Sequence, residues 1–119
     1  MENGAIDDDQ ISASSSIDND AQPGYARLNY NGRWKPKTSQ GADQRWIQID
    51  LRATKIVTGV ITQGWGYWVK KVKVMYEHPA GSGQMQYIRH DNGSDKVCAI
   101  HQSNCFVQCP KTHFILFLN

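Results

Sequence analysis

The chain has 119 residues, of which 39% are hydrophobic and 20% are charged, so we expect one domain with a modest core. No run approaches the roughly 20 apolar residues of a membrane-spanning helix, and the net charge of +2 is too small to favour nucleic acid as a partner. Residues 1–24 lack the basic start and apolar run of a signal peptide, so an export signal, if there is one, is expected to precede this chain.

Short β-forming runs alternate with turn residues along the chain, and this alternation predicts an all-β sandwich or barrel. Residues 10–16 are expected to form the first strand. Residues 18–24 gather Asp, Asn, Pro and Gly and predict a loop, and residues 30–45 predict a longer polar loop.

Three clearer strands follow these loops. Apolar and polar residues alternate in residues 46–51, which predicts one buried face and one solvated face. Residues 55–63 are apolar on both faces and predict a central strand, and residues 69–76 alternate again. The side chains expected to point inward from the two alternating strands are Ile47, Ile49, Leu51, Val72, Val74 and Tyr76.

Two further segments complete the predicted sheet. Residues 85–90 are expected to form a strand after a turn at residues 79–83. Phe114–Leu118 is an uninterrupted apolar run. It should pair inside a sheet, because an exposed apolar edge promotes aggregation.

Charge is distributed unevenly along the chain. Residues 1–24 contain six acidic side chains and no basic one, whereas residues 25–77 contain ten basic and three acidic side chains, an excess of seven positive charges. An anionic partner is one interpretation of this middle region, and an ordinary solvated strand surface is the other.

Six segments in a fixed order carry a family resemblance. They are Met-Glu-Asn-Gly-Ala-Ile (1–6), Gln-Ile-Ser-Ala-Ser-Ser (10–15), Ala-Arg-Leu-Asn (26–29), Trp-Ile-Gln-Ile-Asp-Leu (46–51), Val-Thr-Gly-Val-Ile-Thr-Gln-Gly (57–64) and Trp-Val (68–69) leading into Lys-Val-Met-Tyr (73–76). Together they resemble the discoidin family, also called the coagulation factor 5/8 type C domain. The resemblance implies a discoidin-like domain over residues 1–95, followed by a divergent, cysteine-containing tail at 96–119. One further strand is an option for this tail.

The fold that this resemblance implies is an antiparallel jelly-roll β-sandwich of the galactose-binding type, here expected to lack its closing strands. Family members are recognition modules that bind sugars, anionic phospholipid or extracellular proteins such as collagen through loops at one end. By resemblance the ligand loops are residues 17–25, 30–45 and 64–67. We therefore expect a non-catalytic, extracellular or cell-surface module that binds glycans or glycoproteins as a lectin in cell adhesion.

The predicted ligand-binding side chains combine aromatic faces for a pyranose ring with donors and acceptors for its hydroxyls. For the aromatic residues at 65 and 67, accidental exposure at a hairpin tip is the alternative, and for the three basic residues it is ordinary solvated charge. The full set is Tyr25, Asn29, Tyr30, Asn31, Arg33, Lys35, Lys37, Trp65 and Tyr67.

The alternative partner is anionic phospholipid or a matrix protein bound at a basic surface. Insertion of the first loop into a bilayer is disfavoured, because it carries Asp18 and Asp20 and no bulky apolar tip. The basic residues of this alternative are Arg33, Lys35, Lys37, Lys70, Lys71 and Lys73.

Other conspicuous residues are assigned to structure. Trp34 is expected to support a loop base, and Arg27 and Asp50 are expected to form an inward ion pair, since either charge alone would be costly to bury. No cofactor is expected beyond an optional structural calcium, for which Asn29 stands where a carboxylate would help and Asp43 could contribute.

The tail offers a third hypothesis, a redox- or zinc-responsive element, although its ligand spacing fits the usual zinc knuckles poorly. No Gly-x-Ser-x-Gly, His-Glu-x-x-His or phosphate-binding glycine loop occurs, so an enzyme is not expected. The candidate soft ligands are Cys98, His101, Cys105, Cys109 and His113.

Overall fold

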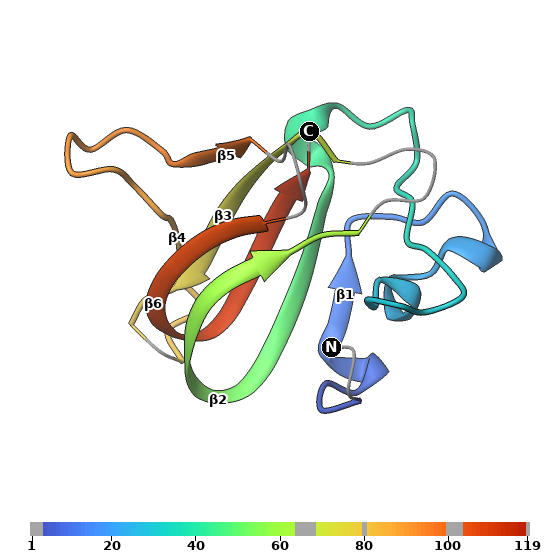
Figure 1. Ribbon diagram of the computed structural model, residues 1–119, viewed down its shortest axis with the longest axis horizontal. Helices are drawn as coiled ribbons and strands as arrows, with labels where there is room; N and C mark the ends of the chain where they lie inside the picture. The colour runs from blue at the N-terminus through green and yellow to red at the C-terminus, as the bar shows by residue number, and fades with distance from the viewer. Residues whose placement is uncertain (1–3, 64–68, 80, 100–103, 119) are drawn as a thin grey trace.

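The computed structural model describes residues 4–63, 69–79, 81–99 and 104–118, with the backbone alone at residues 58, 59, 98, 99 and 104–118 (Figure 1). The described part is all-β, as predicted, and its helices are single 3₁₀ turns. None of these helices is long and apolar enough to cross a membrane. The elements are η1 (Asp8–Gln10), β1 (Ile11–Ala13), η2 (Asn19–Ala21), η3 (Pro23–Tyr25), η4 (Ala42–Gln44), β2 (Trp46–Ile61), β3 (Lys71–Glu77), β4 (Met85–Tyr87), β5 (Val97–Ala99) and β6 (Asn104–Leu118).

The strands pair antiparallel in the order β1-β2-β6-β3-β4, and β5 also pairs with β3. β4 and β5 share one edge of β3, with β5 opposite residues 71–73 and β4 opposite residues 75–77. β6 therefore lies between β2 and β3, although it comes last in the sequence (Figure 1).

The central position of β6 confirms that Phe114–Leu118 is paired inside the sheet. Phe114 lies opposite Ile49 of β2 on one side and opposite Tyr76 of β3 on the other, and the next three residues are likewise paired on both sides. The sequence predicts that the closing strands are missing and leaves one further strand as an option for the tail. The tail instead supplies β5 and β6, and β6 joins β2 to β3.

β2 is long enough to belong to both layers of the sandwich. Ile47 near its start and Val60 near its end belong to the same buried cluster, which requires the strand to fold back on itself. Figure 1 shows β2 and β6 curving together through this bend. The register shifts there, because four residues of β2, 51–54, face a single residue of β6 between the pairs Asp50–His113 and Lys55–Lys111.

Arg52 holds the corner of this bend. Its φ of 56° is in the left-handed region, and its backbone N–H donates to Asp50 Oδ1 at 2.7 Å. Its guanidinium contacts Asp7 Oδ2 at 3.0 Å and Asp9 Oδ2 at 2.7 Å. The buried Gln10 donates from Nε2 to the Asp50 carbonyl at 2.6 Å, so η1 is fastened to the corner through backbone and side chain together.

The buried cluster confirms the alternation predicted for the first half of β2 and for β3. Its members and the other fully buried apolar side chains come from β1, β2, β3 and η2. Leu51 and Tyr76, which are also predicted to point inward, are half-buried. These buried side chains are Ile11, Ala21, Ile47, Ile49, Val60, Val72 and Val74.

The second half of β2 differs from its prediction as a central strand. Ile56 is 72% exposed and Ile61 is also exposed. Among the described residues this half pairs with β6 alone, since β1 reaches only residues 47–49. An apolar composition on both faces therefore did not indicate burial on both faces here.

The predicted ion pair between Arg27 and Asp50 is wrong. Among the described residues, the carboxylate that the Arg27 guanidinium contacts is that of Asp8, and Arg27 Nε also donates to the Gly24 carbonyl at 3.1 Å. The Asp50 carboxylate accepts the Arg52 N–H at the corner instead. Arg27 thus joins η1 to η3, and Asp50 stabilises the bend.

Replacing Val72 by alanine should reduce the free energy of unfolding by about 2 kcal/mol, because the side chain is 1% exposed and its loss leaves a cavity. The matched control is Ile56→Ala, at an exposed position of β2, which should cost less than about 0.5 kcal/mol. Urea unfolding measures both changes. Equal losses in the two variants would contradict the assigned core.

Candidate ligand-binding loops

Two of the predicted ligand loops are tied together by backbone hydrogen bonds. The Ile17 N–H donates to the Lys35 carbonyl at 2.9 Å, and the Lys35 N–H donates to the Ala21 carbonyl at 3.4 Å. The Lys37 N–H donates to Ser15 Oγ at 3.1 Å. Because the loops around residues 17–25 and 31–37 share these bonds, they form one connected surface beside β1.

Trp34 lies between this surface and the buried core and supports the base of the loop, as predicted. Its Nε1 donates to the Ser15 carbonyl at 2.9 Å, and its ring packs against the buried core. Exposure alternates along residues 31–37, so that Trp34 and its alternate neighbours are half-buried. The exposed members of the segment are four of the predicted ligand-binding residues, Asn31, Arg33, Lys35 and Lys37.

Tyr25 and Tyr30 stack against each other and form what we call the tyrosine platform. Their ring centroids lie 5.6 Å apart with an interplanar angle of 23°. Tyr30 is 51% exposed and Tyr25 is half-buried. Gly32 lies close to both, because a Cβ built at this position would be 2.9 Å from Tyr30 Cε1 and 3.2 Å from Tyr25 Cβ.

Asn29 sets the turn that leads into the platform. Its φ of 57° is in the left-handed region, where asparagine is better tolerated than most residues. Its backbone N–H donates to Gln63 Oε1 at 2.8 Å. Asn29 therefore contributes its backbone geometry to the site as well as an exposed side chain.

Gln63 is a residue that the sequence analysis did not select. It follows the end of β2 in the Thr-Gln-Gly part of a family-like segment, directly before the third predicted loop at residues 64–67. Its contact with Asn29 joins the end of β2 to the platform. Its place in this family-like segment, next to a predicted ligand loop, is the one feature of the sequence that could have selected Gln63 as a site residue. Trp65 and Tyr67 lie outside the described residues, so their role stays a prediction.

The structure offers no metal centre among the residues it describes in full. In that part of the chain, no group of three or more His, Cys, Asp or Glu side chains is arranged to hold an ion. The backbone places Cys98 opposite Val72, and Cys105 and Cys109 opposite two residues of the second half of β2. The zinc hypothesis for the tail stays a prediction, and His101 lies outside the described residues.

The predicted basic surface is partly neutralised on β3. Lys73 Nζ lies 3.2 Å from Asp95 Oδ2 and 5.3 Å from the centre of the Tyr87 ring. Asp95 also lies 3.5 Å from Arg89 Nε. Lys70 and Lys71 remain exposed.

A two-layer β-sandwich with tied loops beside its first strand defines a discoidin-type domain. The family model of the F5/8 type C domain matches residues 10–99, which is most of the chain, and the chain belongs to this family. The resemblance stated from the order of the segments is therefore confirmed.

Individual relatives include coagulation factor VIII of Sus scrofa, 44% identical over 70 residues, and neuropilin-1 of Gallus gallus, 36% identical over 92 residues. Coagulation factor V of Pseudonaja textilis is 41% identical over 70 residues. The matches cover 54%, 71% and 54% of this chain, respectively, and 3%, 10% and 5% of those proteins. The chain thus corresponds to a small part of each relative.

Replacing Gly32 by alanine should disturb the tyrosine platform, because the added Cβ would lie closer to the Tyr30 ring than van der Waals contact allows. We expect a change in the tyrosine bands of the near-ultraviolet circular dichroism spectrum and in the ring proton shifts of both tyrosines. The neighbouring exposed variant Asn31→Ala should leave these signals unchanged. Unaltered ring signals in Gly32→Ala would contradict the described packing.

Proposed function

We propose that this domain is a non-catalytic recognition module that binds glycans or glycoproteins at the tyrosine platform. The observation that carries the proposal is the stacked pair of Tyr25 and Tyr30, with Tyr30 half-exposed. We further propose an extracellular or cell-surface location and a role in cell adhesion. Membership of the F5/8 type C family supports this class of function.

The chemistry of the platform suits a sugar. A pyranose presents a face of C–H groups that can pack on the exposed part of the Tyr30 ring, and its hydroxyls require hydrogen-bond donors and acceptors around that ring. Asn29 and Asn31 flank Tyr30 in the sequence and are exposed, and Arg33 is exposed on the same loop. The platform is pre-organised by its stacking and by the bond from Asn29 to Gln63, which reduces the entropy cost of binding.

Binding of anionic phospholipid through the exposed side chains of Arg33, Lys35 and Lys37 is the second candidate. Each cation near an anionic membrane contributes about 1 kcal/mol, so three would give about 3 kcal/mol. The exposed carboxylates of Asp18 and Asp20 on the adjoining loop oppose this attraction. The expected membrane affinity is therefore low.

A glycan array tests the proposal. The parent chain should bind a defined set of glycans, and Tyr30→Ala should lose at least about tenfold in affinity because the ring face is removed. Tyr30→Phe keeps the ring and serves as the matched control, with most of the affinity retained. If Tyr30→Ala bound the same glycans as the parent, the tyrosine platform would not be the binding site.

Vesicle sedimentation separates the two candidates. We expect little binding to vesicles containing phosphatidylserine at physiological ionic strength, because exposed charges are screened over about 8 Å there. Strong binding that disappears with added salt and in Lys35→Gln, together with a negative glycan array, would replace the glycan proposal by the lipid one.

A further inference from the structure

A second candidate binding surface lies along β3, and one of its walls comes from η4, at the end of the predicted loop at residues 30–45. Strand register assigns its residues to one face of the sheet. Lys71 and Lys73 are two positions apart on β3, so their side chains project to the same side. Val97 of β5 lies directly opposite Lys73, and Tyr87 of β4 lies opposite Met75, two positions further along β3. All four side chains therefore share this face.

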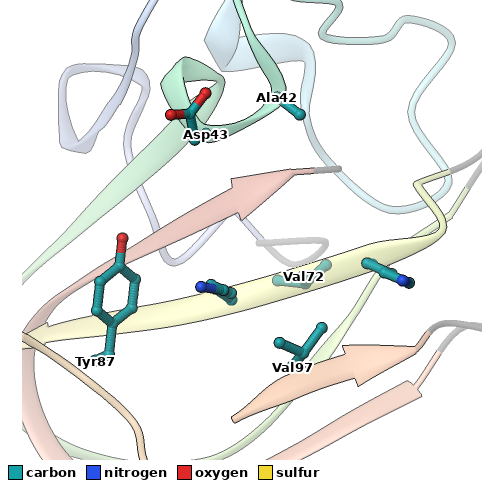
Figure 2. A pocket seen from close by; sticks show the side chains of 7 residues that line it. Ala42, Asp43, Val72, Tyr87 and Val97 are labelled. Carbon is teal, nitrogen blue, oxygen red and sulfur yellow. The ribbon is translucent and has the colours of Figure 1, made fainter. Parts of the chain in front are cut away.

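These residues border a groove of about 300 Å³, which we call the β3 groove. Its wall is completed by Ala42 and Asp43 of η4, and Val72 also contributes to its lining. Figure 2 shows Asp43 and Val97 on opposite sides of β3 and Tyr87 at one end. Volumes near 300 Å³ are at the small end of ligand pockets, so the groove suits a ligand about the size of one sugar ring.

Two opposite charges in the groove are available to a ligand. Within the described part of the chain, neither the Lys71 ammonium nor the Asp43 carboxylate contacts a hydrogen-bonding or charged partner, and both residues are exposed. Lys73 is held by Asp95 at 3.2 Å and lies over the Tyr87 ring. Lys71 is therefore the cation that can meet an anion, and Lys73 adds positive potential beside it.

The remaining lining residues of the β3 groove determine which kind of anionic ligand fits it. Val97 is 44% exposed and offers an apolar surface, which a C–H face or a methyl group can cover. The Asp43 carboxylate accepts hydrogen bonds from hydroxyl groups, but it repels a compact dianion such as phosphate. The matching ligand carries one carboxylate, several hydroxyls and an apolar face.

We propose that the β3 groove binds an acidic monosaccharide, of the uronic or sialic acid type, as a binding site separate from the tyrosine platform. The ligand carboxylate pairs with Lys71, and its hydroxyls donate to Asp43. Its C–H or methyl face packs on Val97, beside Tyr87. This site does not depend on the function proposed for the platform.

The test is a titration of the ¹⁵N-labelled chain with glucuronic acid and N-acetylneuraminic acid, with galactose and inorganic phosphate as comparison probes. At least one acidic sugar should shift the amide signals of Lys71, Lys73, Tyr87 and Val97. Neither comparison probe should shift them at the same concentration. Equal binding of galactose or of phosphate, or no shift with either acidic sugar, would overturn the proposal.

Variants locate the charge that binds. Lys71→Gln should weaken acidic-sugar binding at least about tenfold, because a charge-assisted hydrogen bond is lost. The matched control Lys70→Gln removes the same charge one residue away, outside the groove, and should change affinity less than about twofold. Lys71→Arg should retain binding. A loss in Lys70→Gln equal to that in Lys71→Gln would indicate general charge attraction and overturn the assignment.

Two further variants test the apolar wall of the β3 groove and its independence from the tyrosine platform. Val97→Asp places a second carboxylate in the groove and should abolish binding, with an unchanged thermal melt showing that the fold persists. Tyr30→Ala removes half of the tyrosine platform and should leave acidic-sugar binding at the β3 groove unchanged, whatever the glycan array shows. Loss of the Lys71 signal shifts in Tyr30→Ala would contradict a separate site.

Discussion

The reversal of β2 at Arg52 is the constraint on which the rest of the structure depends. One strand supplies Ile47 to the core before the bend and Val60 after it, so the two layers are covalently continuous. Exposed ion pairs such as those of Arg52 contribute only about 0.2–1 kcal/mol each. The corner is therefore specified chiefly by backbone geometry, namely a left-handed residue and the hydrogen bonds that Asp50 and Gln10 make there.

β6 links the bent strand β2 to β3. It follows β2 through the bend and pairs with β3 along its last residues, so the end of the chain connects segments that are distant in sequence. The start of β3, where the β3 groove lies, consequently faces η4, which directly precedes β2. The groove is a product of this pairing, because its walls come from four separate elements.

The two proposed sites use the scaffold differently. The tyrosine platform is built from loops, and its order comes from local features, including the turn at Asn29 and the close packing of Gly32. The β3 groove is built mainly on strands, whose register determines the spacing of its charges. Neutral ring stacking in one site and charge pairing in the other would allow a domain of this size to contact two kinds of sugar.

The sequence by itself determined the fold class, the family and the inward faces of residues 46–51 and 69–76, because burial on one side of a strand imposes a period of two that is visible locally. It also selected the tyrosines and the exposed residues of the 31–37 segment as candidates for binding. Tertiary structure alone decided the exposure of Ile56, the partner of Arg27, the contact of Gln63 with Asn29 and the assembly of the β3 groove. Each of these depends on which distant segment lies alongside, and that is settled by the bend of β2 and the insertion of β6, which leave no local pattern in the chain.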